Sequence, residues 1–474
     1  MVFRRFCKVL FLVAVTSGLT KGGANLRAAE FRAGAAQVDI TPQEGAPMAG
    51  YYQFRAVQGV RDKIFSKALV VEQDGVRAAF VVVDLISTTR AMVEEARKLI
   101  AAQHGIPPDR VMISATHTHT GPQLIRGSMM DQLTRVNTPP GQAYGAQLPV
   151  LVAKSVGDAV AKLTPAKASA AVGRAEGISF NRRAIGKDGS LIWQPGPGDR
   201  RVLKPAGPVD PDLGLLVVEA LETRSAPLAT YVNFAMHPTS IGGGTRISAD
   251  FPGALCRILT ERRGKGTDMV AIFANGCCGN INHNNYMDNV PRKTGTEEAN
   301  RLGTALADSA ERAWPQLTPL TVRALRAKST VVTLPRRTFT EAQIQHAKDV
   351  VSRMETDKPG TVVLAEAFCT LDTVNLKDKP LQAEVQVITF SDDLAVVSMP
   401  GEIFVELGLA IKAGSPFKHT FIAELANGSL GYIPNREAFP QGSYEVVSSR
   451  AEVGSGERLV ETALALLKGL HGGK

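Results

Sequence analysis

The sequence predicts an α/β fold in which layered mixed β-sheets are flanked by helices. Short apolar and β-branched runs alternate with stretches of helical periodicity, as in chains whose sheets are covered by helices. The 474 residues are 44% hydrophobic and 21% charged, the composition of a globular protein. Apolar strand patterns continue beyond the polar loops in the middle of the chain, which favours one large domain over two.

The individual elements follow from local patterns. Strands are predicted at 67–72 and 78–84, on either side of the turn dipeptide Asp74-Gly75. A helix is predicted at 91–103, shortly before two prolines. Further strands are expected at 111–115, 230–236, 269–273, 385–390 and 394–398, further helices at 300–313, 339–353 and 459–470, and a surface loop at 200–211.

The first residues have the features of a secretory signal peptide. Arg4, Arg5 and Lys8 precede a short apolar run at 9–15, and small residues follow towards Ala29. The apolar run is too short to span a bilayer. We therefore expect residues 1–29 to be removed and 30–474 to be exported, to the periplasm or the outside of the cell; the alternative is a buried first helix.

Charge and cysteine content exclude several classes of protein. The net charge of +9 falls to +4 without residues 1–29, which hold five basic residues and no acidic one. With no block of lysine and arginine, a nucleic-acid partner is not expected. Without residues 1–29 the chain has four cysteines, and no CxxC spacing indicates a thiolate zinc site. One disulfide bond stays open as an alternative among the four, Cys256, Cys277, Cys278 and Cys369.

Two of the eight histidines, His117 and His119, directly follow the strand predicted at 111–115. Residues i and i+2 of an extended segment face the same side, so the two imidazoles can converge on one point. Imidazole is a preferred zinc ligand. The alternative is a pair of histidines that hydrogen-bond within a loop.

Two more candidate ligands also follow apolar strands. His237 precedes a glycine-rich loop, and Glu402 follows Pro400-Gly401. Three strand ends that deliver histidine or glutamate suit a catalytic zinc site, where three protein ligands leave a position for water. Taken alone, His237 could be structural, and Glu402 could be an acid at the start of a helix.

In this order, these segments resemble the neutral (non-lysosomal) ceramidase family, especially short bacterial proteins that carry only its catalytic part. The resemblance runs from Gly34 to Tyr432 and is weakest at about 323–381. The matching stretches are GAAQVDITP (34–42), MAGY (48–51), SATHTHTGP (114–122), FNRR (180–183), HPTS (237–240), SAD (248–250), FANGCCGN (273–280), PGE (400–402) and ANGSLGY (426–432).

The resemblance implies a zinc-dependent hydrolase that cleaves an N-acyl amide bond. Ceramide, a compound of sphingolipid metabolism, contains such a bond. The resemblance also implies that zinc is held by His117, His237, Glu402 and Tyr432, that His119 transfers a proton or binds substrate, and that Arg182 orients the substrate. The implied partner is a small-molecule or lipid N-acyl amide, and peripheral contact with a membrane is left open. A pocket with long apolar strips would favour a lipid, and a polar pocket a small amide.

The sequence also departs from the family pattern. Gly276 stands where ceramidases have a serine assigned as nucleophile, and Asn280 replaces an acidic residue, so zinc-bound water is the expected attacking group. The C-terminal β-sandwich of ceramidases is not expected in this chain. Two alternatives stay open: a secreted protein that only binds a ligand, and a hydrolase that uses Cys277. The same zinc site could also cleave an ester or a lactone.

Overall fold

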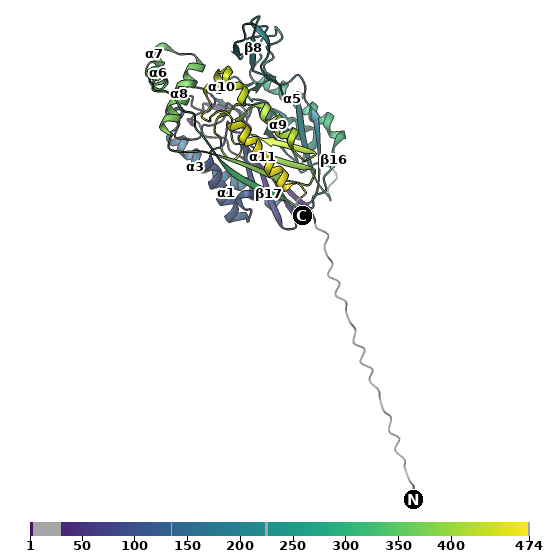
Figure 1. The fold of residues 1–474 in the computed structure, drawn as a ribbon. Coiled ribbons are helices and arrows are strands. Elements are labelled where there is room, and N and C mark those ends of the chain that lie inside the picture. Colours follow the sequence, from purple (N-terminus) through teal and green to yellow (C-terminus); the bar gives the residue numbers. More distant parts are fainter. Residues whose placement is uncertain (3–29, 134, 223–225, 473–474) are drawn as a thin grey trace.

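Two β-sheets pack face to face in the computed structural model, and helices cover their outer surfaces (Figure 1). The structure describes residues 1–2, 30–133, 135–222 and 226–472. Nearly all of the predicted signal peptide, residues 3–29, lies outside the described residues. The predicted α/β class with layered mixed sheets is confirmed.

The larger sheet has nine strands in the order β14-β12-β11-β6-β1-β3-β4-β5, with β16 paired to β6. Neighbours are antiparallel except at the two ends, where β4 pairs with β5 and β12 with β14 in parallel. The strands are β1 (Arg32–Asp39), β3 (Phe65–Gln73), β4 (Val76–Val83), β5 (Val111–Ala115), β6 (Thr164–Arg174), β11 (Asp212–Ala220), β12 (Ala229–Phe234), β14 (Val270–Asn275) and β16 (Thr318–Pro319).

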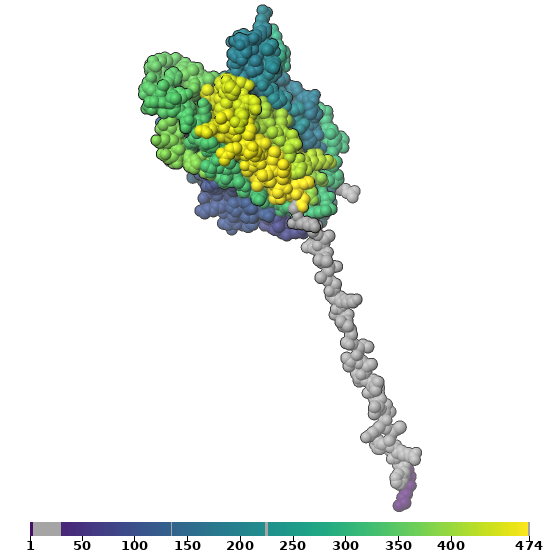
Figure 2. Space-filling view, viewed as in Figure 1, coloured from purple at the N-terminus to yellow at the C-terminus, as the bar shows by residue number. Residues whose placement is uncertain are grey.

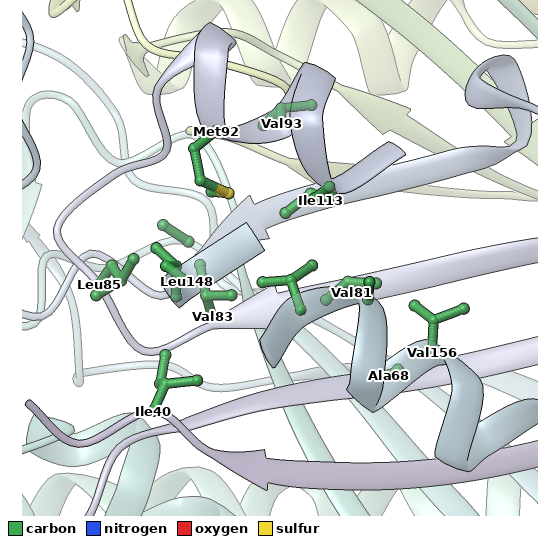
Figure 3. Packing of buried hydrophobic residues seen from close by; sticks show 14 of the residues in the cluster. Ile40, Ala68, Val81, Val83, Leu85, Met92, Val93, Ile113, Leu148 and Val156 are labelled. Atoms are coloured by element: carbon green, nitrogen blue, oxygen red, sulfur yellow. The ribbon is translucent and has the colours of Figure 1, made fainter. Parts of the chain in front are cut away.

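The second sheet has the order β17-β18-β19-β21, and only β19 and β21 are parallel. Phe80 of the first sheet stacks on Phe390, which directly follows β18, with ring centroids 4.9 Å apart. Alternation along β4 divides its side chains between two cores: Phe80 faces the second sheet, whereas Val81 and Val83 face helices (Figure 3). The strands are β17 (Arg326–Leu334), β18 (Leu381–Thr389), β19 (Leu394–Ser398) and β21 (His419–Ala423).

Amphipathic helices close both outer faces. Four of them cover the larger sheet and two cover the smaller one, so the molecule has a helix–sheet–sheet–helix order of layers. The former are α1 (Arg90–His104), α3 (Pro139–Ala161), α4 (Asp250–Leu259) and α5 (Thr296–Ala313), and the latter are α9 (Val405–Gly414) and α11 (Ser455–Leu470). No helix in the described part of the chain is long and apolar enough to cross a membrane.

Two smaller regions extend from these layers (Figure 2). One contains β8 and stands at the top of Figure 1; the other is the lobe of α6 to α8. The segment 200–211 was expected to be a loop, but residues 202–205 form a strand that pairs with β8. This pairing provides hydrogen-bond partners for the backbone groups of the segment. The elements are β8 (Arg183–Gly186), β9 (Leu191–Trp193), β10 (Val202–Pro205), α6 (Glu341–Ser352), α7 (Met354–Asp357) and α8 (Thr361–Asn375).

Short elements in the connections between the main strands and helices complete the fold. They include two-residue ladders and single helical turns. They are β2 (Gly59–Val60), α2 (Met129–Leu133), β7 (Phe180–Asn181), β13 (Arg246–Ile247), β15 (Ile281–Asn282), β20 (Glu402–Ile403), β22 (Tyr432–Ile433) and α10 (Tyr444–Val447), with single turns at Pro108–Arg110, Thr260–Gly264, Trp314–Gln316 and Arg436–Gln441.

Candidate metal centre

The candidate site lies where parallel strand pairs of both sheets end. His117 follows β5, His237 follows β12, and Glu402 follows β19. Each of these strands pairs in parallel with a neighbour, so the carboxyl ends of the two strands lie at the same edge of the sheet. The chain leaves the sheet at this edge. The loops at these ends are therefore free to present polar side chains to one another.

The structure brings together the histidines and the glutamate that the sequence singled out. The ligand atoms of His117, His119 and His237 all lie within 4.8 Å of one another, a group that could hold a metal ion. Glu402 Oε2 is 3.3 Å from Nε2 of His117 and 3.3 Å from Nε2 of His237. Tyr432 is the direct partner of Glu402 in the parallel pair β20–β22. The individual ligand roles stay predictions.

The backbone brings His117 and His119 together by a route that differs from the expected one. The segment is not extended, because His117 has φ = 74°, in the left-handed region. Their Nε2 atoms are nevertheless 3.4 Å apart. A non-glycine residue in this region typically costs about 1–3 kcal/mol and persists where the surroundings impose it, often at functional sites.

Hydrogen bonds fix the tautomer of all three imidazoles. Nδ1 of His117 lies 2.6 Å from the carbonyl of Ile86, and Nδ1 of His237 lies 2.7 Å from that of Cys278. Nδ1 of His119 lies 3.1 Å from the carbonyl of Gly50. A carbonyl only accepts, so each Nδ1 carries the proton in the neutral ring. Each Nε2 then presents a lone pair to the shared centre, the arrangement found in metal-ligating histidines.

Electrostatics act differently on the facing groups. Although burial opposes it, the charge of Glu402 raises the pKa of His117. Burial and the charge of Arg182 lower the pKa of His237 to about 3. Burial, with the charges of His117 and His237, lowers the pKa of His119 well below its usual value. Although burial opposes it, the neighbouring His117 and His237 hold the pKa of Glu402 well below its usual range. The centre is therefore a carboxylate beside two imidazoles, those of His119 and His237, that burial keeps neutral.

Such a set of groups fits a cation. Nε2 of His237 and Oε2 of Glu402 are buried and make no hydrogen bond of normal geometry within the described chain. Because the ring proton of His237 is on Nδ1, neither atom has a proton to share across their 3.3 Å separation. Buried polar atoms without partners are rare and call for a missing group. Imidazole nitrogens with a carboxylate suit zinc, so a divalent metal fits here.

Arg182 lies behind Tyr432. Its Nη2 donates to the Tyr432 hydroxyl at 3.1 Å and to the Gly279 carbonyl at 2.8 Å, and its Nε donates to Glu445 at 2.8 Å. Arg182 does not line the cavity described below, so the structure shows it positioning the tyrosine. Its predicted role in orienting the substrate stays a prediction.

Sequence reasoning did not identify the buried carboxylates behind the site. Glu424 accepts hydrogen bonds from the thiol of Cys278 at 2.8 Å and from the backbone amide of Ile403 at 3.0 Å. Burial raises the pKa of Glu424 to about 8. Its position at the end of β21, two residues before the ANGSLGY segment, is the one signal that could have indicated it. Glu445 lies in no matching stretch, and the sequence contains no comparable signal for it.

A cavity of about 180 Å³ opens onto the cluster. Tyr52, Tyr444 and Phe368 form an aromatic wall: Tyr52 stacks on Phe368, and the Tyr52 and Tyr444 hydroxyls are 3.3 Å apart. The remaining wall is mostly polar. Other lining residues include Ile86, Ser87, Gln123, Arg126, Ser128, Met130, Ala365, Asp372, Ser429, Ser448 and Arg450.

Neither Gly276 nor Cys277 lines this cavity. A Cβ atom on Gly276 would lie 3.1 Å from that of Ala235, so the residue that replaces the family's serine faces the protein interior. Burial, followed by the Glu424 charge, raises the pKa of the Cys277 thiol well above its usual value, which makes it a poor nucleophile. Cys256, Cys277, Cys278 and Cys369 are all free, so the structure contains no disulfide among the described cysteines.

Comparisons with known proteins agree with this architecture. Residues 31–391 match the model of the N-terminal region of neutral/alkaline non-lysosomal ceramidases. The fold is similar to the crystal structure of neutral ceramidase from Pseudomonas aeruginosa, with a TM-score of 0.74, 19% identity, and coverage of 94% of this chain and 75% of that one. A ceramidase structure described as complexed with C2 gives a TM-score of 0.74, 19% identity, and 93% and 75% coverage. The chain belongs to the neutral/alkaline non-lysosomal ceramidase family.

Proposed function

We propose that this chain is a zinc-dependent hydrolase of an N-acyl amide bond. The family is one of hydrolases, and the observation that supports zinc is the convergence of three histidine ring nitrogens beside Glu402, with Nε2 of His237 and Oε2 of Glu402 left without a hydrogen-bond partner in the described chain. His117, His237, Glu402 and Tyr432 would hold the metal. Zinc bound here supplies a Lewis acid that polarises a carbonyl group and lowers the pKa of water.

The chain's own side chains supply the remaining functions. His119 is neutral, and its Nε2 lone pair is able to take a proton and pass it to the departing amine. Arg182 holds the Tyr432 hydroxyl in place and places a positive charge behind it, which favours negative charge developing on the carbonyl oxygen.

We also propose that the chain is exported after removal of residues 1–29. The support is the sequence pattern of a basic start, an apolar run and small residues. The mass and N-terminal sequence of the protein recovered outside the cytoplasm of the producing cell test this. A protein that keeps Met1 and stays in the cytoplasm would contradict export.

The deciding experiment measures zinc content and amide hydrolysis for the wild type, His117→Ala and His346→Ala. His346 is exposed on α6, so its replacement is the matched control. We expect one zinc per chain in the wild type and the control, and the loss of both zinc and activity in His117→Ala. A wild type that binds no zinc when it is supplied would overturn the proposal. Zinc binding without turnover of any amide, ester or lactone would favour a protein that only binds its ligand.

A further inference from the structure

The outer part of the substrate cavity carries an excess of positive charge. Arg126 and Arg450 line it, and Asp372 is the one carboxylate among its described lining residues apart from Glu402 of the metal cluster. Asp372 is already engaged, because Oδ2 accepts from Arg450 Nη2 at 2.8 Å and Oδ1 accepts from the backbone amide of Met129 at 2.6 Å. Zinc at the inner end would add further positive charge beside Glu402.

Arg126 contributes a positive charge that no direct ion pair among the described residues neutralises. Its guanidinium donates to the hydroxyl of Ser87 and forms no ion pair within the described chain. The residue is exposed at the mouth of the cavity. The charge of Asp131 acts on it favourably, that of Arg450 unfavourably and that of Glu402 favourably, so its head lies within electrostatic range of the candidate metal centre.

The loop that carries Arg126 is held in place by backbone hydrogen bonds. The Asp131 carboxylate accepts from the backbone amides of residues 126, 127 and 128 at 2.6, 2.5 and 3.2 Å. Asp372 of α8 anchors the next residue, Met129. The same Asp372 holds Arg450, so one carboxylate positions both the loop of Arg126 and the second cation. Positioned charges of this kind bind a ligand with little loss of conformational entropy.

The size and lining of the cavity limit the ligand. At about 180 Å³ it is smaller than the roughly 300–1,000 Å³ of typical ligand pockets. Apart from the aromatic wall, Ile86, Met130 and Ala365 are its apolar side chains. A small cavity with a mixed polar and apolar lining favours a compact amide over one with a long acyl chain.

Building on the proposed hydrolase, we infer that the substrate is a compact N-acyl amide with an anionic oxygen group, a carboxylate or a phosphate, on its amine side, and that Arg126 is the residue that selects it. A guanidinium binds either group through two parallel N–H···O bonds. The anion relieves the repulsion between Arg126 and Arg450. Arg126 thus acts in binding and specificity, at a distance from the bond that is broken.

Matched substrate pairs test this with the zinc-loaded protein. The carboxylate pair is N-hexanoylglycine and N-hexanoylglycinamide, and the phosphate pair is N-hexanoyl-O-phosphoethanolamine and N-hexanoylethanolamine. We expect the wild type to prefer the anionic member of one pair by roughly 10- to 100-fold in kcat/KM, as charged hydrogen bonds give. Arg126→Gln should lose most of this preference through a higher KM, and Arg126→Lys should restore part of it.

Arg135→Gln is the control, since it removes one positive charge from a neighbouring exposed residue outside the cavity and should keep the wild-type preference. The pair that shows the preference identifies the anion as carboxylate or phosphate. Hydrolysis of the neutral members with no preference in either pair would overturn the inference while the proposed function stands.

If no pair is hydrolysed, binding decides the inference separately, and the proposed function is decided by the zinc and activity experiment described above. Calorimetric titration with N-hexanoylglycine and with N-hexanoyl-O-phosphoethanolamine then compares the wild type with Arg126→Gln. At least tenfold weaker binding of one of them by the variant would support anion recognition by Arg126. Equal affinities, or no binding by either protein, would overturn it.

Discussion

Two buried charged clusters lie on either side of Tyr432, and they differ in how fully their atoms are paired. In the first, Glu445 accepts from Arg182 at 2.8 Å, Arg183 at 2.8 Å and Trp193 at 3.0 Å, and it is completely buried. In the second, Oε2 of Glu402 lies 3.3 Å from Nε2 of both His117 and His237 and makes no hydrogen bond of normal geometry within the described chain. In both clusters nitrogen atoms surround a carboxylate, and only in the first do both carboxylate oxygens accept hydrogen bonds from them.

This difference separates a structural cluster from a functional one. A buried ion pair with complete hydrogen bonding holds its elements in one arrangement, here α10 against β8. An incompletely satisfied cluster is retained at a free-energy cost and requires a further ligand. Burial and charge alone therefore do not identify the site; the convergence of incompletely paired ligand atoms on one point does.

The largest effect on stability is expected from Glu445→Ala. It leaves the buried guanidinium groups of Arg182 and Arg183 without their carboxylate, which should lower the free energy of unfolding by about 3–5 kcal/mol. Urea unfolding of the variant and the wild type measures this. A loss below about 1 kcal/mol would show that the first cluster is not the structural element described above.

Zinc should stabilise the second cluster. At a free concentration one hundred times its Kd, zinc should raise the free energy of unfolding by about 2.7 kcal/mol, because it binds the folded chain and not the unfolded one. Glu402→Gln should remove most of this gain, and magnesium should give none, because it prefers oxygen ligands. Thermal unfolding with and without each metal measures the effect, and equal stabilisation by both metals would contradict the assignment of the cluster.

His283 provides a buried imidazole outside both clusters. Burial lowers its pKa to about 4 from the ordinary 6.5. Between these values the unfolded chain binds a proton that the folded chain does not, so stability is complete above pH 6.5 and falls as the pH drops towards 4. The loss between pH 7 and pH 5 is about 2 kcal/mol. Urea unfolding at both pH values should show a smaller difference for His283→Asn, and an unchanged one would contradict this.

The smallest effect is expected at an exposed ion pair. Lys154 and Asp158 lie 2.6 Å apart, closer than Arg182 and Glu445, but water surrounds them. Asp158→Asn should change the free energy of unfolding by no more than about 0.5 kcal/mol. The same urea experiment compares it with Glu445→Ala, and similar losses would mean that burial does not control the contribution of these pairs.

The sequence predicted the elements whose pattern is local. The strand predicted at 67–72 lies within β3, the one at 78–84 lies within β4 except for its last residue, and the helix at 91–103 lies within α1. The helix α3, in contrast, was not predicted, because Pro149 lies inside it. Its start follows ordinary rules once seen, with Thr138 as the N-cap and prolines in the first turn. Tertiary packing on the sheet overrides the unfavourable interior proline.

By itself, the sequence determined the alternation of strands and helices and the strand-end positions of His117, His237 and Glu402. Both depend on residues close together in the chain. Only the tertiary structure decided that these side chains meet, that Glu424 and Glu445 support them, and that Arg126 faces the same cavity as Arg450. Those contacts join residues far apart in the sequence, and the packing of two sheets, which no local pattern records, brings them within hydrogen-bonding and electrostatic range.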